Sequence, residues 1–158
     1  ICVEKLTFNP DGTIQQLPFW TAKGVDPVGK LDPYRRIEAE TIAWSEGLKT
    51  EKSEAGMYVT AIHDGDYIRV RNVDFKKGAK SFEAVAASSS SGGQIEIRLD
   101  DKEGMLIGTC VIGNTGGPES WKTFQAQVDK VKGVHDVYFI FRGGEDELFN
   151  FDCWKFIR

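Results

Sequence analysis

The chain has 158 residues, of which 41% are hydrophobic and 28% are charged, and its 20 Lys and Arg against 24 Asp and Glu give a formal net charge of -4. This length and composition suit one globular domain with a short appendage and exclude a disordered chain. The acidic balance argues against nucleic acid as a partner, and no apolar run approaches the roughly 20 residues of a bilayer span, so we expect no membrane partner.

The first 33 residues differ in character from the rest. Residues 2–8 suit a strand, Asn9-Pro10-Asp11-Gly12 is a strong turn signal, and residues 13–17 can pair back as a hairpin. Glycine and proline then interrupt an extended segment. We therefore predict that residues 1–33 are a hairpin and linker left from a preceding domain, followed by a module over 34–158. Because the chain begins with Ile1 and shows no leader, we expect it to be part of a longer protein.

From Tyr34 onward the sequence predicts a succession of short strands. The apolar or alternating runs are 36–42, 67–71, 95–100, 137–141 and 148–157, and they are separated by turn-forming segments at 88–93, 113–118 and 143–147. Residues 121–131 fit a weak helix and a strand equally. Many short strands with frequent turns predict an all-β fold, an antiparallel β-sandwich or jelly roll.

Two carboxylates, Glu38 and Glu40, flank Ala39 on the predicted first strand, so their side chains share one face about 7 Å apart. Three interpretations stay open: a glycosidase acid and base, ligands for a hard cation, or a solvated strand face. The acidic segment 63–66 is interpreted as a turn whose aspartates cap backbone amides. The three cysteines, Cys2, Cys110 and Cys153, suit neither a disulfide framework nor a zinc site, and the sequence cannot choose a pair for a single disulfide.

Aromatic side chains are the other chemical resource, because Trp and Tyr can stack on a sugar or pack in a core. Those in or beside predicted strands are Trp44, Tyr58, Tyr67, Trp121, Tyr138 and Trp154. Tyr67 is the best surface candidate, since it alternates with Ile68 and shares a polar face with Arg69 and Arg71. Glu96 and Arg98 offer matching polar groups on another strand.

An ordered set of motifs resembles the family 6 carbohydrate-binding modules over about residues 34–158. The motifs are Arg36–Glu40, Ile62–Tyr67, Asn72–Phe75, Gly92-Gly93 before Ile95–Asp100, Ile107–Thr109, Thr115–Gly117, Gly133–Tyr138 and Leu148–Asp152. Residues 7–14 resemble the last hairpin of family 43 glycoside hydrolases, which are arabinofuranosidases and xylosidases. The resemblance implies a jelly roll with a structural calcium ion, held by Glu38, Glu40, the backbone near Tyr58, and Asp152.

The resemblance also implies two sugar sites. At the first, on the sandwich edge, two rings clamp a sugar and an asparagine binds it; the asparagine maps to Asn150, but Ala61 and Pro118 stand where the rings belong. Trp44, Glu46 or Tyr58 could substitute. The second site lies on the concave sheet face and maps to Tyr67, with Glu96 as our candidate partner. We expect sugar binding mainly at Tyr67.

We therefore expect a noncatalytic carbohydrate-binding module of a secreted, extracellular, arabinoxylan-degrading enzyme. Its partners would be a xylan-type polysaccharide and its own hydrolase domain, and we expect a monomer. One alternative is a structural module that has lost sugar binding and packs against its hydrolase, which Ala61 and Pro118 favour. The other is a small hydrolase that uses Glu38 and Glu40.

Overall fold

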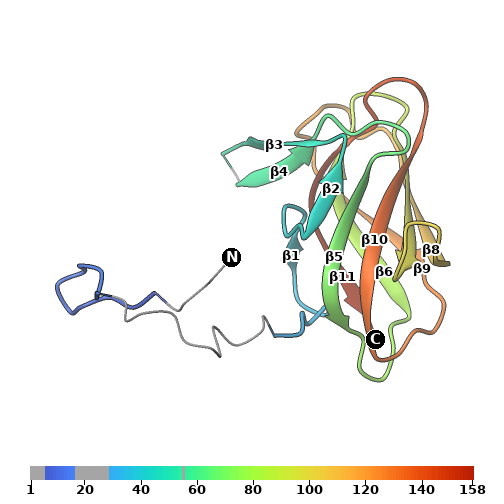
Figure 1. Cartoon of the computed structure of the whole chain (residues 1–158). Helices are drawn as coiled ribbons and strands as arrows, with labels where there is room; N and C mark the ends of the chain where they lie inside the picture. The colour runs from blue at the N-terminus through green and yellow to red at the C-terminus, as the bar shows by residue number, and fades with distance from the viewer. Residues whose placement is uncertain (1–5, 17–28, 55) are drawn as a thin grey trace.

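The computed structural model describes residues 6–16, 29–54 and 56–158. Within these residues the chain forms eleven β-strands and no helix (Figure 1). The strands are β1 (Ile37–Glu38), β2 (Trp44–Glu46), β3 (Lys49–Lys52), β4 (Met57–Thr60), β5 (Tyr67–Asp74), β6 (Ser81–Ala87), β7 (Gly93–Leu99), β8 (Met105–Ile112), β9 (Lys122–Gln127), β10 (Val134–Gly143) and β11 (Asn150–Ile157). Among the described residues, no helix is long and apolar enough to span a membrane.

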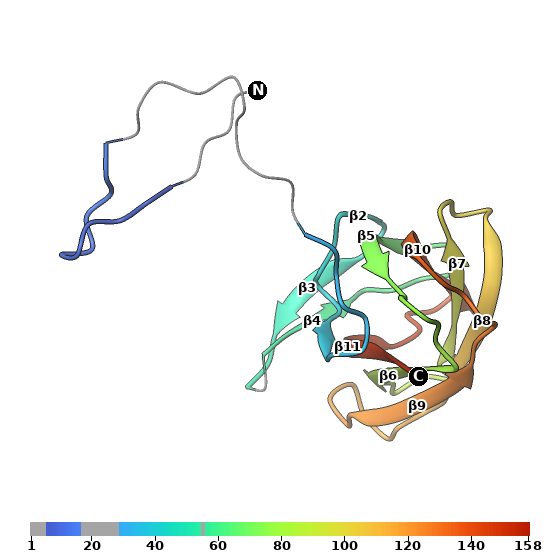
Figure 2. The same ribbon diagram turned by 90° about the horizontal axis from the view of Figure 1, so that it is seen from below.

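The strands form two sheets that face each other, as Figure 2 shows from below. One sheet has the order β3-β4-β11-β6-β9, and β1 also pairs with β11; the other has the order β2-β5-β10-β7-β8. The pairs between these strands are antiparallel, for example β10 with both β5 and β7. The predicted antiparallel β-sandwich is confirmed.

Alternation of side chains builds the core between the sheets. In β7, Ile95, Ile97 and Leu99 are buried, whereas Glu96 and Arg98 lie on the opposite face, as a period of two requires. Rings from both sheets meet in the core: the rings of Phe139 and Trp154 lie 5.0 Å apart at their centroids in an edge-to-face arrangement. Trp154 is therefore a core residue rather than a sugar platform.

For three segments the structure corrects, decides or confirms the secondary structure that the sequence predicts. The predicted strand over 36–42 is wrong beyond Glu38, because the Thr41 amide donates to the Glu38 carbonyl at 3.0 Å and closes a turn. The ambiguous segment 121–131 contains the strand β9, which pairs with β6. The predicted turn at 63–66 is confirmed, since the His63 amide donates to the Asp66 carboxylate at 2.8 Å.

The N-terminal turn is present in the described part of the hairpin. The Gly12 amide donates to the Asn9 carbonyl at 2.9 Å, and Phe8 bridges Ile14 as an isolated antiparallel pair. The predicted strand at 2–8 and the pairing up to residue 17 lie partly outside the described residues, as does Cys2. Cys110 and Cys153 are buried free thiols, and burial raises their pKa values to about 11 and about 12.

The segment that leads into the sandwich is bonded to it before Tyr34. Leu31 pairs in parallel with Val73: its amide donates to the Asn72 carbonyl at 2.8 Å, and its carbonyl accepts from the Asp74 amide at 2.9 Å. The Tyr34 hydroxyl then reaches the Phe75 carbonyl at 2.6 Å. The last residues of the predicted linker thus form part of the sheet edge.

Candidate functional site

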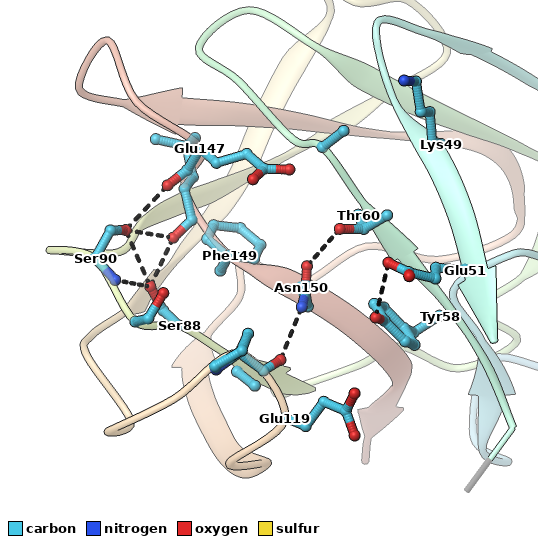
Figure 3. A pocket seen from close by; sticks show the side chains of 15 residues that line it. Lys49, Glu51, Tyr58, Thr60, Ser88, Ser90, Glu119, Glu147, Phe149 and Asn150 are labelled. Carbon is cyan, nitrogen blue, oxygen red and sulfur yellow. Dashed lines mark hydrogen bonds between the residues drawn. The ribbon is translucent and has the colours of Figure 1, made fainter. Parts of the chain in front are cut away.

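The first candidate site is a pocket of about 430 Å³ at the edge of the sandwich, where β3, β4 and the start of β11 meet the loops after β6 and before β9 (Figure 3). This volume falls in the range of ~300–1,000 Å³ that ligand pockets occupy. Ala61, Pro118 and Asn150 all line it, so the structure brings together the three positions that the sequence assigned to the edge site.

Asn150 is already bonded to the protein within this pocket. Its Oδ1 accepts from the Thr60 hydroxyl at 2.7 Å, and its Nδ2 donates to the Pro118 carbonyl at 2.7 Å (Figure 3). A sugar hydroxyl must therefore compete with these bonds. Because a net hydrogen bond contributes only about 0.5–1.5 kcal/mol, such an exchange gains little.

The edge pocket also offers little ring surface. Its two aromatic lining residues, Tyr58 and Phe149, are 5% and 4% exposed. The Tyr58 ring packs edge-to-face on Trp121 at 5.4 Å, and its hydroxyl donates to Glu51 at 3.0 Å. Burial and this hydrogen bond raise the pKa of Tyr58. Tyr58 thus packs against the protein and does not replace the two sugar-stacking rings that are absent at positions 61 and 118.

The second candidate site is the outward face of the five-stranded sheet, called here the outer face. The registers align its side chains in two rows across the strands: Glu46, Tyr67, Ile140, Glu96 and Thr109 in one, and Trp44, Arg69, Tyr138, Arg98 and Leu106 in the next. Tyr67 and Glu96 therefore lie on the same row, on either side of Ile140. The predicted pairing of these two residues on one sheet face agrees with the register.

Tyr67 is half-buried on this face rather than freely exposed. Its ring centroid lies 6.1 Å from that of Tyr138, and the Nζ of Lys102 approaches it at 5.6 Å. Arg69 in turn lies over the Tyr138 ring at 5.7 Å. The two tyrosines form an aromatic surface, and a cationic side chain lies over each ring.

Ion pairs hold the polar side chains of the outer face in place. Arg69 donates to Asp136 at 2.7 Å, and Arg98 donates to Glu96 at 3.0 Å. Burial alone would raise the pKa of Asp136, but hydrogen bonds from Arg69 and the Asn72 amide hold it below its usual value. Glu96 keeps a second oxygen for a ligand, since both bonds from Arg98 go to its Oε2.

Trp44 is a residue of this face that the sequence analysis assigned elsewhere. It was proposed as a substitute ring for the edge site, whereas the register places it opposite Arg69 on the outer face, 63% exposed. It is not among the residues that line the edge pocket. The alternation of Trp44 and Glu46 about Ser45 was the available signal, but only the pairing of β2 with β5 identifies the face.

The predicted metal ligands come together in part. One ligand atom from each of Glu38, Asp152 and Cys153 lies within 4.8 Å of the others, where β1 pairs with β11. Burial raises the pKa of the Cys153 thiol to about 12, and the two carboxylates are the hard oxygen donors of this group. Phe151 pairs with Val59, so Tyr58 and Asp152 are the chain neighbours of a paired position on β4 and β11.

Glu40 does not share a strand face with Glu38, because β1 ends before it. Its Oε2 is buried and has no hydrogen-bond partner among the described residues, which is costly unless a cation or water satisfies it. Arg36 donates to Glu38 at 2.9 Å and to Asp152 at 3.0 Å, and the bond to Glu38 raises its pKa. Glu38 and Asp152 thus offer adjacent hard oxygen donors of the kind that Ca²⁺ takes, whereas Glu40 is not part of this cluster in the described residues.

Comparison with known proteins agrees with this geometry. The family model "carbohydrate binding module (family 6)" matches residues 38–158. An arabinoxylan arabinofuranohydrolase from Bacillus subtilis is 45% identical over 99% of this chain, and the chain spans 32% of that enzyme's length.

Solved structures give the same result. A family 6 carbohydrate-binding module from Clostridium cellulolyticum, in complex with xylose, superposes with a TM-score of 0.79 at 41% identity, over 81% of this chain and 100% of that one. A family 43 arabinoxylan arabinofuranohydrolase from Bacillus subtilis, in complex with cellotetraose, gives 0.80 at 44% identity, over 98% of this chain and 33% of that one. The chain is therefore a noncatalytic module of the kind found in family 43 hydrolases, and it belongs to the family 6 carbohydrate-binding modules.

Proposed function

We propose that this module binds xylan-type polysaccharide of plant cell walls through its outer face and thereby holds a hydrolase domain close to its substrate. The observation that carries the proposal is the aromatic surface of the exposed Trp44 and the half-buried Tyr67 and Tyr138, interleaved with arginines and acids on three adjacent strands. Ring faces pack on the apolar C–H surface of sugars, while charged side chains bond the hydroxyl groups.

The choice of xylan rests on the relatives, which include arabinoxylan hydrolases and a module bound to xylose. Sugar affinities in the millimolar to micromolar range amount to only about -4 to -8 kcal/mol, so two or three rings supply a large share. Tethering raises the effective concentration of the polysaccharide near the attached hydrolase domain. The module works as a monomer of a secreted, extracellular enzyme.

Calorimetric titration with xylohexaose and with arabinoxylan tests the proposal. Tyr67→Ala is expected to lower the affinity at least tenfold, whereas Tyr67→Phe, which keeps the ring, and Asn150→Ala are expected to stay near the unmodified protein. Loss of binding in Asn150→Ala alone would place the sugar in the edge pocket. No binding by the unmodified module to either ligand would favour the alternative of a structural module that packs against its hydrolase.

A structural calcium ion completes the proposal. The carboxylates of Glu38 and Asp152, the buried oxygen of Glu40 and the backbone carbonyl of Tyr58 are its ligands. The ion ties the first strand to the last and stabilises the sandwich without contacting sugar. Arg36 pairs with the same two carboxylates, so the guanidinium and the ion compete for them.

Thermal unfolding in calcium and in chelator tests this site. Calcium is expected to raise the melting temperature, since a ligand at 100 times its Kd stabilises the folded state by about 2.7 kcal/mol. Asp152→Asn should remove most of this shift, and Glu145→Gln, in an exposed loop, should keep it. Equal melting temperatures of the unmodified module in millimolar calcium and in chelator would contradict the assignment.

A further inference from the structure

Beyond the row of Tyr67 and Glu96, the outer face opens into a shallow hollow of about 610 Å³. Five glycines contribute to its wall: Gly92, Gly93, Gly113, Gly143 and Gly144. Packing requires three of them, because a Cβ atom would lie 2.0 Å from the Ile112 carbonyl oxygen at Gly92, 2.6 Å from the Arg142 carbonyl oxygen at Gly93 and 2.4 Å from Leu148 at Gly143. Backbone rather than side chains therefore forms much of the surface.

The polar side chains of the hollow lie on one further row of the sheet. Arg142 on β10 pairs with Gln94 on β7, which pairs with Val111 on β8. The guanidinium of Arg142 meets the carboxylates of Asp64 and Glu96 only at 4.0 Å. Within the described ranges, no hydrogen bond to the protein is recorded for the side chains of Arg142 and Gln94, so their donors are available to a ligand.

This donor set suits a neutral, hydroxyl-rich group. Guanidinium and amide donors lie beside two carboxylate acceptors, and sugar hydroxyls can bond to both kinds. An acidic sugar is disfavoured because its carboxylate would lie close to Asp64 and Glu96. None of the described residues that line the hollow is aromatic, so the group that it holds is recognised by its hydroxyls and not by stacking.

Glu96 joins the hollow to the ring-bearing part of the outer face. It lines the hollow and also lies on the row of Tyr67. Adjacent rows of one face are about 7 Å apart along a strand. A polysaccharide whose main chain lies on Tyr67 therefore has room for a substituent over Arg142 and Gln94.

We propose that this hollow is an accessory subsite for a neutral sugar branch, which makes the module prefer decorated polysaccharide to the linear main chain. The inference rests on the proposed function, because it requires the main chain to lie on the outer face. One or two net hydrogen bonds that together contribute about 1.4 kcal/mol correspond to a preference of about tenfold.

The test compares a linear xylo-oligosaccharide with an arabinose-substituted one of the same main-chain length, by calorimetric titration. Gly144→Val adds a branched side chain at the wall of the hollow, where a Cβ atom meets nothing within 4 Å. Arg142→Met removes the donors but keeps an apolar stem. Gly29→Val is the matched control, since a Cβ there also meets nothing within 4 Å and Gly29 lies outside the hollow.

The unmodified module and Gly29→Val are expected to bind the substituted ligand about tenfold more tightly. Gly144→Val and Arg142→Met should reduce the ratio to about one and leave the affinity for the linear ligand within twofold. Equal binding of both ligands by the unmodified module, or a ratio that survives both variants, would overturn the subsite alone. Absence of binding to either ligand would overturn the proposed function as well, so the two failures are distinguishable.

Discussion

The edge pocket and the outer face contain similar kinds of residues, yet they differ in what those residues are free to do. At the edge, Asn150 is bonded to Thr60 and Pro118, and the Tyr58 ring packs on Trp121. On the face, Trp44 is 63% exposed, and ion pairs hold Arg69 and Glu96 in place beside the rings. The presence of a suitable residue in a pocket therefore does not make it available for binding.

The difference has an energetic basis. A sugar at the edge must exchange existing hydrogen bonds of Asn150 for new ones, and this exchange is nearly neutral. A sugar on the face buries apolar ring surface that water now contacts, which is favourable at roughly 25 cal/mol per Å². Burial of aromatic rings therefore accounts for most of the difference in binding free energy between the two sites. The edge pocket lacks both rings, because Ala61 and Pro118 stand at their positions.

After Tyr67→Ala, the largest effect on sugar binding is expected from Trp44. Trp44→Ala should lower the affinity for xylohexaose about tenfold, or about 1.4 kcal/mol, because it removes the most exposed ring of the outer face. Calorimetric titration measures the change, with Trp44→Tyr as the matched control that keeps a ring. An unchanged affinity in Trp44→Ala would show that the sugar does not extend to β2.

Asn150→Ala is expected to act on stability rather than on binding. Losing the bonds to Thr60 and Pro118 should lower the free energy of unfolding by about 1–2 kcal/mol. Urea unfolding measures this change. Thr60→Val removes one of the same bonds, so its effect should combine with that of Asn150→Ala less than additively. Full additivity would mean that the two side chains act independently.

A smaller, pH-dependent effect is expected from Asp136 on the outer face. The pKa of its carboxyl is below the usual value in the folded protein, so its contribution is present above pH ~4 and lost as pH falls through the folded pKa. The stability difference between the unmodified module and Asp136→Asn should be less than about 1 kcal/mol at pH 7, since the pair is partly exposed. Thermal unfolding from pH 7 to pH 3 should show this difference shrinking, and a constant difference would contradict the ion-pair assignment.

The smallest effect is expected from restoring a ring to the edge pocket. Ala61 lines the pocket with a φ of 53°, a left-handed conformation that a larger side chain can also adopt at some cost. Ala61→Trp should add a weak second site, so that the stoichiometry of xylohexaose rises from one toward two at high ligand concentration. Val134→Trp, on a different strand and outside both this pocket and the hollow of the outer face, is the control. A stoichiometry that stays at one would mean that one ring is too little to bind sugar at the edge.

Much of the fold could be predicted from the sequence because its strands alternate cleanly. Residues 95–100 and 67–71 show the period of two that β7 and β5 display, and the turn at 63–66 lies where its glycine and aspartates indicate. The strand predicted over 36–42 was too long. Its side chains alternate past Glu38, but a backbone hydrogen bond from the Thr41 amide to the Glu38 carbonyl closes a turn there. A pattern of side chains contains no direct information about where the main chain stops pairing.

The sequence alone determined the family, the sandwich, and the positions where edge-site rings are replaced by Ala61 and Pro118, since these depend on residue identity and order. Only the tertiary structure decided which face Trp44 lies on and whether Asn150 is free. Strand register sets the first, and partners from distant segments set the second, as Thr60 and Pro118 do for Asn150. Contacts between residues far apart in sequence follow from folding the whole chain, and local patterns do not encode them one by one.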